Sequence, residues 1–216
     1  MSKTLILTGG SMDIDWAKDW LKDKSFDYCI AADSGLSYAD KLGVRVDYLL
    51  GDYDSVDGQI LEKYKKQTAF KVYPREKDYT DTHLAIETAI KNGASDIYIL
   101  GATGTRMDHT ITNIGNMKLA LDCGIDCHIV DKNNYIYLLN DKTGVHTISK
   151  KKQYGRYVSI VPMTEEVTLT LKGFKYGLDK YILKQGLSIC QSNEIEAKEA
   201  FIIIHKGLAA IFETID

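Results

Sequence analysis

Short apolar runs alternate with amphipathic segments along residues 4–131, and this alternation restricts the possible folds more than any other feature. Each run has only a few residues, as strands do when both faces of their sheet are buried. Repeated strand–helix alternation predicts a mostly parallel α/β sheet with right-handed crossovers. The apolar runs are Thr4–Thr8, Tyr28–Ala32, Tyr48–Leu50, Phe70–Tyr73, Ile97–Leu100 and Cys127–Val130, and the helical segments lie near 13–23, 35–42, 57–67, 80–92 and 108–122.

The pattern changes after residue 133, where short β-rich segments are separated by Gly, Asn, Asp or charged turns. No helical period of useful length occurs there, which favours an antiparallel sandwich or barrel. The fold class we expect is therefore α/β, with an N-terminal mostly parallel sheet domain followed by a C-terminal antiparallel β-sandwich. Turn residues at 132–144 mark the boundary, and we assign the two domains to residues 1–138 and 139–216.

Charge and composition exclude several classes of protein. The 27 Lys and Arg against 30 Asp and Glu give a net charge of −3, which supplies no general attraction to nucleic acid or to an anionic membrane. No apolar run approaches the length of a membrane span, and the N-terminus does not resemble a signal peptide. The four cysteines lack the spacing of a disulfide framework, as expected of thiols in a reducing cytoplasm.

Acidic residues follow several of the predicted strands. In an open parallel sheet these turns share one edge, where ligands bind. So many carboxylates repel one another unless a cation lies among them, and oxygen-only ligands suit Mg²⁺, which reaches substrate phosphates. Gly51, Gly101 and Gly104 allow close approach to phosphates, and Arg106 can hold charge on a transferring group. The carboxylates are those of Asp33, Asp52, Asp54, Asp78, Asp81 and Asp108.

Simpler roles remain open for some of these residues. Asp78, Asp81 and Asp108 lie where an acid at a helix start is ordinary, and Asp33 can be a turn former. His109 can contact a phosphate or pack at a helix start. The chain contains neither a Walker-type phosphate loop nor a dinucleotide fingerprint, and neither an H-E-x-x-H motif nor a G-x-S-x-G elbow.

Several motifs together resemble those of the thiamine pyrophosphokinase family. They are Ala32-Asp33-Ser34-Gly35, Gly51-Asp52-Tyr53-Asp54-Ser55, Lys77-Asp78-Tyr79-Thr80-Asp81, Gly101 to His109 with Asn113, Gly173 to Leu178 with Leu183 and Gly186, and Ser192-Asn193-Glu194. The resemblance spans nearly the whole chain in order. One departure is Ser34, which stands where the family more usually has Gly.

The resemblance implies an ATP-binding α/β domain and a β-sandwich that binds thiamine and forms a homodimer, with thiamine bound where the subunits meet. The family transfers the pyrophosphoryl unit of ATP to the hydroxyethyl group of thiamine, requires Mg²⁺ and releases AMP. Carried over by position, the metal-associated acids are Asp52, Asp54 and Asp81, while Asp78, Asp108 and Arg106 complete the candidate catalytic set. The candidate binding residues are Asp33, Gly51, Ser55, Lys77, Thr80, Gly101, Gly104 and His109 for ATP, and Ser192 and Asn193 for thiamine.

Two alternative functions remain: a Mg²⁺-dependent phosphohydrolase or kinase acting on another small molecule, and a non-catalytic module that binds nucleotide or thiamine. For the transfer itself, we hypothesise that Asp78 or Asp108, outside the metal shell, assists deprotonation of the thiamine alcohol. The expected partners are thiamine, ATP and a second copy of the chain, without nucleic acid or membrane.

Overall fold

The computed structural model describes residues 2–51, 56–66, 68–72 and 78–216. The chain divides into two compact units, Met1–Lys132 and Asn133–Asp216. The boundary that we expected after residue 138 falls within a strand of the second unit, Asn134–Asn140. None of the helices in the described ranges combines the length and apolar character that a membrane crossing requires.

The first unit is an α/β unit built on six parallel strands. Their order in the sheet is β6-β5-β1-β2-β3-β4, and every neighbouring pair is parallel. The strands are β1 Ser2–Leu7, β2 Tyr28–Ala32, β3 Tyr48–Gly51, β4 Ala69–Val72, β5 Ala94–Leu100 and β6 Asp126–Val130. The central strands are buried along most of their length, which explains their apolar runs.

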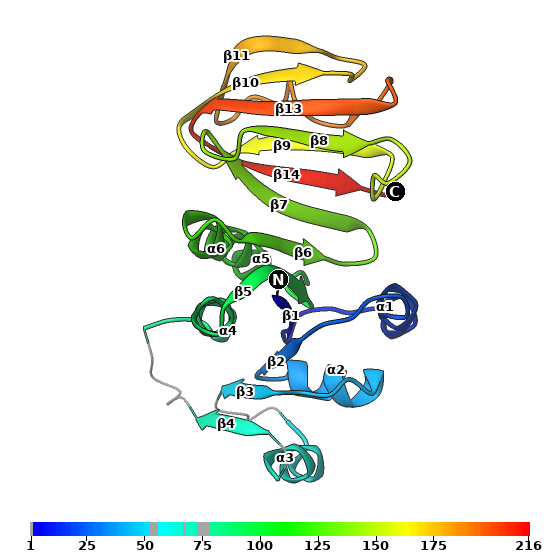
Figure 1. Ribbon diagram of the computed structural model, residues 1–216, viewed down its shortest axis with the longest axis vertical. Coiled ribbons are helices and arrows are strands. Elements are labelled where there is room, and N and C mark those ends of the chain that lie inside the picture. The colour runs from blue at the N-terminus through cyan, green and yellow to red at the C-terminus, as the bar shows by residue number, and fades with distance from the viewer. Residues whose placement is uncertain (1, 52–55, 67, 73–77) are drawn as a thin grey trace. The chain divides into compact units, whose positions relative to one another are not determined.

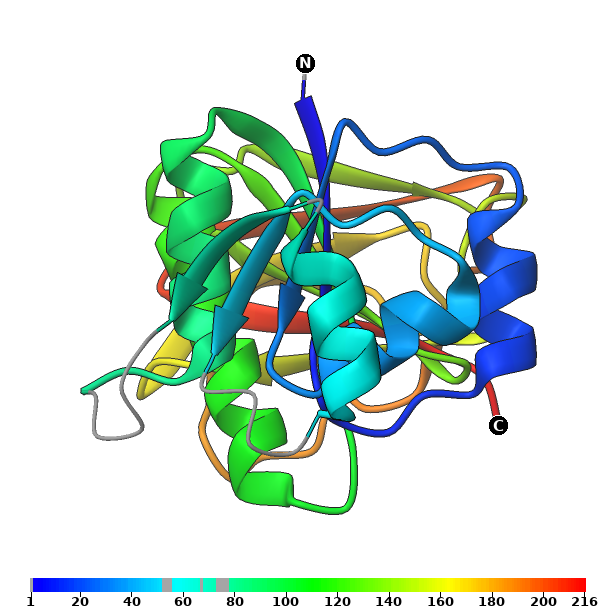
Figure 2. The same cartoon turned by 90° about the horizontal axis from the view of Figure 1, so that it is seen from below.

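Helices cover both faces of this sheet. They are α1 Ile14–Leu21, α2 Gly35–Leu42, α3 Gly58–Lys65, α4 Asp81–Lys91, α5 Met107–Asn116 and α6 Lys118–Asp122. Helices α1 and α2 lie on one face and α4, α5 and α6 on the other (Figure 1), and Figure 2 shows α1 and α4 on opposite sides of the parallel strands. The mostly parallel α/β unit predicted from the alternation is confirmed.

One helix differs from the expectation. The predicted helix over 108–122 is interrupted at Met117, between α5 and α6. The apolar periodicity continues through the interruption, since Ile114 and Met117 are both buried. Gly115 and Asn116 have low helix propensity, so the backbone can turn there without losing the packed face.

The second unit is an antiparallel β-sandwich, also as expected. One set of strands runs β12-β9-β14-β7 and the other β11-β10-β13-β8, with antiparallel pairing throughout. The strands are β7 Asn134–Asn140, β8 Val145–Ser149, β9 Tyr157–Pro162, β10 Glu166–Lys172, β11 Leu178–Lys184, β12 Asn193–Glu194, β13 Glu199–Lys206 and β14 Leu208–Thr214. Alternate residues of β13 are buried, which is the pattern of a sheet with one face in the core.

Candidate functional site

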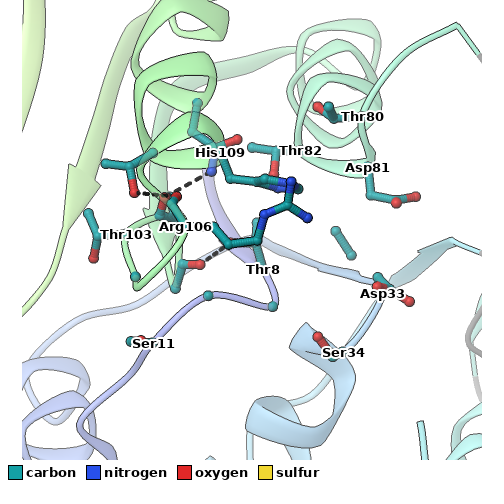
Figure 3. A pocket seen from close by; sticks show the side chains of 18 of the residues that line it. Thr8, Ser11, Asp33, Ser34, Thr80, Asp81, Thr82, Thr103, Arg106 and His109 are labelled. Atoms are coloured by element: carbon teal, nitrogen blue, oxygen red, sulfur yellow. Dashed lines mark hydrogen bonds between the residues drawn. The ribbon is translucent and has the colours of Figure 1, made fainter. Parts of the chain in front are cut away.

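A cavity of about 580 Å³ opens at the carboxyl ends of β1, β2 and β5, within the first unit. A volume of this size is typical of a small-molecule site. Helices α2, α4 and α5 begin beside it, and Figure 3 shows side chains that line it. It is lined by Thr8, Gly9, Gly10, Ser11, Ala32, Asp33, Ser34, Tyr38, Thr80, Asp81, Thr82, Gly101, Ala102, Thr103, Gly104, Thr105, Arg106, His109, Thr110 and Asn113.

Two glycine-containing loops form one wall of the cavity, one after β1 and one after β5. Gly10 N donates to Gly101 O at 2.7 Å, and Ser11 N donates to Thr103 O at 2.7 Å. A Cβ at Gly10 would lie 2.3 Å from both of these carbonyl oxygens. Only glycine therefore allows the two loops to approach so closely.

Asp33 occupies the end of β2 in a strained backbone conformation. Its φ is 51°, in the left-handed region that few residues other than glycine adopt. The backbone is held there because Asp33 N donates to Leu50 O at 2.7 Å. Gly51 lies directly alongside at the end of β3, since a Cβ at Gly51 would lie 3.1 Å from Asp33 Cα. Strain of this kind is concentrated at functional sites, and here it holds a carboxylate at the cavity wall.

The start of α4 brings a hydroxyl group and a carboxylate to the cavity. The Thr80 side chain caps this helix by accepting a hydrogen bond from His83 N at 3.3 Å. Asp81 follows in the first turn, where a negative charge interacts favourably with the helix dipole. Thr80 is therefore the N-cap of α4, whereas Asp78 is exposed and does not line the cavity.

Arg106 and Asp108 form a bidentate ion pair at the start of α5. Arg106 Nε donates to Asp108 Oδ1 at 3.3 Å, and Arg106 Nη2 donates to Oδ2 at 2.6 Å. The hydrogen bonds from Arg106 lower the pKa of the Asp108 carboxyl, and the same contact raises the pKa of Arg106. Arg106 lines the cavity but Asp108 does not, and the contact between them is an ion pair at the surface.

The two predicted thiamine residues lie in the second unit and have different environments. Ser192 has a φ of 51°, and its N–H donates to Ser159 Oγ at 2.9 Å. The Asn193 side chain is buried; its Oδ1 accepts from Tyr176 N at 3.1 Å, and its Nδ2 donates to Tyr176 O at 2.8 Å. Asn193 thus fixes the backbone of Tyr176, whose side chain is 61% exposed.

Seven of the predicted residues line the cavity together: Asp33, Thr80, Asp81, Gly101, Gly104, Arg106 and His109. Asp52, Asp54, Ser55 and Lys77 lie outside the described residues. Two of the three predicted metal ligands, Asp52 and Asp54, are among these four. Within the described ranges, no three His, Cys, Asp or Glu side chains are close enough together to hold a metal ion.

Several lining residues were not among the candidates from the sequence, chiefly hydroxyl and amide side chains: Thr8, Ser11, Tyr38, Thr82, Thr110 and Asn113. Thr8 Oγ1 donates to Gly101 O at 2.6 Å, and Asn113 Nδ2 donates to Ala102 O at 2.8 Å. Both side chains are buried and hold the loop after β5. The signal for Thr8 was its place at the end of the first apolar run. For Asn113 the only signal in the sequence was its place in a matched motif.

Comparison with known proteins gives concordant matches for both units. Two family models match: Thiamin pyrophosphokinase, catalytic domain, over residues 21–128, and Thiamin pyrophosphokinase, vitamin B1 binding domain, over residues 145–208. The thiamine pyrophosphokinase of Bacillus subtilis (strain 168) is 33% identical over 168 residues, which cover 77% of each chain.

Solved structures agree with these matches. A crystal structure of thiamine pyrophosphokinase from Bacillus subtilis has a TM-score of 0.87 at 26% identity and covers 100% of both chains. That of thiamin pyrophosphokinase from Geobacillus thermodenitrificans has a TM-score of 0.83 at 26% identity, covering 100% of this chain and 98% of the other. The parallel sheet and the sandwich therefore both have counterparts in proteins of one family.

Proposed function

We propose how the site works from the premise that this chain belongs to the thiamine pyrophosphokinase family. The reaction of this family transfers the pyrophosphoryl group of ATP to the hydroxyl of thiamine, which gives thiamine diphosphate and AMP. The oxygen of the alcohol attacks the β-phosphorus. The bond between the β-phosphorus and the oxygen that bridges it to the α-phosphorus breaks, and AMP leaves with that oxygen. One observation carries the proposed arrangement: Asp33, Asp81 and Arg106, from three separate motifs, line one cavity at the carboxyl edge of the parallel sheet.

ATP occupies this cavity in our proposal, with its phosphates toward Arg106 and the loop that contains Gly101 and Gly104. Transfer to an alcohol needs little covalent help from the protein, because positioning and charge neutralisation supply most of the rate enhancement. Arg106 is suited to the second task because a guanidinium remains charged and can contact two phosphate oxygens at once. The two hydrogen bonds that Arg106 donates to Asp108 orient this guanidinium before the nucleotide arrives.

The donor chemistry of the cavity fits Mg²⁺. Among the described residues, the carboxylates that line it belong to Asp33 and Asp81, and hydroxyl groups rather than sulfur atoms surround them. We propose that Asp81 binds the metal with Asp52 and Asp54, which follow β3 outside the described residues. Bound there, Mg²⁺ would neutralise the charge of the triphosphate. Asp33 holds its carboxylate at the same wall of the cavity.

The two candidates for the general base are not equivalent. Asp108 is already engaged by Arg106, and its lowered pKa makes it a weaker acceptor for the proton of the alcohol. Asp78 lies next to Thr80 and Asp81 in the same motif, and no Lys or Arg of the described ranges forms an ion pair with it. Neither carboxylate lines the cavity, so our proposal of Asp78 as the group that assists deprotonation rests on the difference in ion pairing alone.

The thiamine site involves the second unit in our proposal. Ser192 and Asn193 lie in the matched vitamin B1 binding region, and Asn193 fixes the backbone of Tyr176, whose side chain is exposed. An exposed aromatic ring carried on a fixed backbone suits the rings of a cationic ligand. We further propose that the chain acts as a homodimer, with thiamine bound where the subunits meet, in the cytoplasm where ATP and Mg²⁺ are supplied.

Product analysis tests this function. ATP, Mg²⁺ and thiamine should give AMP only when all three are present, and Asp81→Asn should lower the rate more than about 100-fold, as loss of a metal ligand would. Asp122→Asn serves as the control because Asp122 lies on α6 and pairs with Lys118 at the surface. ADP or free phosphate as the main product would favour the alternative kinase or phosphohydrolase. A loss below about threefold in Asp81→Asn would contradict the assigned role.

A further inference from the structure

Helix α2 contacts the loop after β1 through two side chains one turn apart. Tyr38 Oη donates to Gly10 O at 2.7 Å, and Tyr38 also lines the cavity. Ser34 lies four residues earlier, and its Oγ is 2.0 Å from the point where a Cβ on Gly9 would stand. The geometry points to Tyr38 as a positioning residue for the nucleotide, acting through the Gly9–Ser11 loop. This inference rests on ATP as the occupant of the cavity.

The hydrogen bond from Tyr38 holds the middle residue of the Gly9–Ser11 loop, which is also bonded through its backbone N–H. Gly10 N and Ser11 N donate to the loop after β5, at Gly101 O and Thr103 O. These two bonds fix one side of the Gly9–Ser11 loop, and Tyr38 fixes the carbonyl of Gly10 on the other side. A loop of three small residues has little packing of its own, so such bonds decide where it lies. The nucleotide then meets a wall that is already ordered, and binding does not bear the cost of ordering it.

Helix α2 does not depend on this hydroxyl for its own place. Leu36 and Ala39 are fully buried, and Gly43 ends the helix in a left-handed conformation with its N–H bonded to the last carbonyls. Removing the Tyr38 hydroxyl should therefore leave the helix packed and release only the loop. The Tyr38 ring would stay at the cavity wall, so the change affects one hydrogen bond and little else.

The test is Tyr38→Phe, with Tyr48→Phe as the matched control. Tyr48 Oη approaches Asn92 Oδ1 at 3.5 Å, beyond the C-terminus of α4, so its loss removes a phenolic contact of the same unit away from the cavity. We expect Tyr38→Phe to raise the Kd and KM for ATP about threefold to tenfold, the range that one hydrogen bond supplies. The KM for thiamine and kcat should remain within about twofold, and Tyr48→Phe should leave all three constants unchanged.

Equal ATP affinity in Tyr38→Phe and the wild type would overturn the inference. So would a parallel rise in the KM of both substrates together with a lowered melting temperature, since that result indicates a structural role only. ATP binding is measured by calorimetry without thiamine, so it remains informative if the wild type forms no AMP. In that case the proposed function fails, whereas the effect of Tyr38 on nucleotide binding is still decided.

Discussion

At the scale of single residues, Arg106 and Asp108 are both site candidates in the sequence, but their contacts in the structure differ. Both residues belong to one matched motif, yet only Arg106 lines the cavity. The carboxylate of Asp108 accepts both guanidinium hydrogen bonds, which keeps its pKa below the usual range. A carboxyl with a lowered pKa is ionised throughout the neutral range, so its titration cannot shape the rate there.

Replacing Asp108 by Asn tests this role. Arg106 keeps its charge but loses a charged partner, so we expect kcat/KM to fall about threefold to tenfold. The shape of the pH–rate profile between about pH 6 and 9 should not change, because Asp108 does not titrate there. Asp40→Asn, which removes the partner of Lys63 elsewhere in the unit, should have no effect on the rate. If Asp108→Asn removes an ionisation from the profile, Asp108 is the base after all.

Single residues also mark the limit of prediction from sequence. Asp33, Asp81 and Arg106 could be predicted because each lies in a loop or helix start after a strand, and parallel strands bring these segments to one edge. Tyr38 could not, because it lies within α2 and nothing in its local pattern distinguishes a side chain facing a cavity from one facing solvent. The Arg106–Asp108 contact likewise depends on side-chain geometry, which spacing alone does not determine.

At the scale of elements, the two loops after β1 and β5 act as one structure because backbone bonds join them. We expect Gly10→Ala to destabilise the protein by about 1–3 kcal/mol, since its Cβ would overlap two carbonyl oxygens that cannot both move. Gly115→Ala is the matched control. Gly115 lies within α5 with nothing within 4 Å of an added Cβ, so alanine should stabilise the helix by about 0.5–1 kcal/mol.

Urea unfolding of both variants measures the two free energies of unfolding. A Gly10→Ala protein as stable as the wild type would show that the loops can separate at little cost. If the KM of this variant for ATP is unchanged as well, the two loops are not part of the nucleotide site.

Elements with strong periodicity were predicted well, and the exceptions have physical causes. The strand β2 has the predicted bounds, Tyr28–Ala32, because turn residues define both of its ends. The strand β12 contains only Asn193 and Glu194, too short to produce an alternation. Its position depends instead on tertiary contacts, such as the pairing of Asn193 with Val158 of β9. Such contacts cannot be read from a two-residue segment.

At the scale of the whole molecule, each unit has its own core and exposes its own apolar side chains. Four of the ten large apolar side chains that are exposed in the described part of the chain lie between residues 176 and 189. They are Tyr176, Ile182, Leu187 and Ile189. Because these four residues are close in sequence, we expect them to contribute to one surface that another protein covers. The segment also precedes Ser192 and Asn193, the proposed thiamine residues.

This concentration leads to a prediction about assembly. The wild type should sediment with twice the 24.2 kDa mass of one chain. Placing carboxylates at Leu187 and Ile189 should raise the dimer dissociation constant about 100-fold, because a charge buried in an apolar interface is not compensated. The KM for thiamine should rise with the fraction of monomer, whereas ATP binding should not change. Val145→Glu, at an exposed apolar position outside the segment, should leave the dimer intact. If the double variant still sediments as a dimer and turns over thiamine normally, this segment is not the subunit interface.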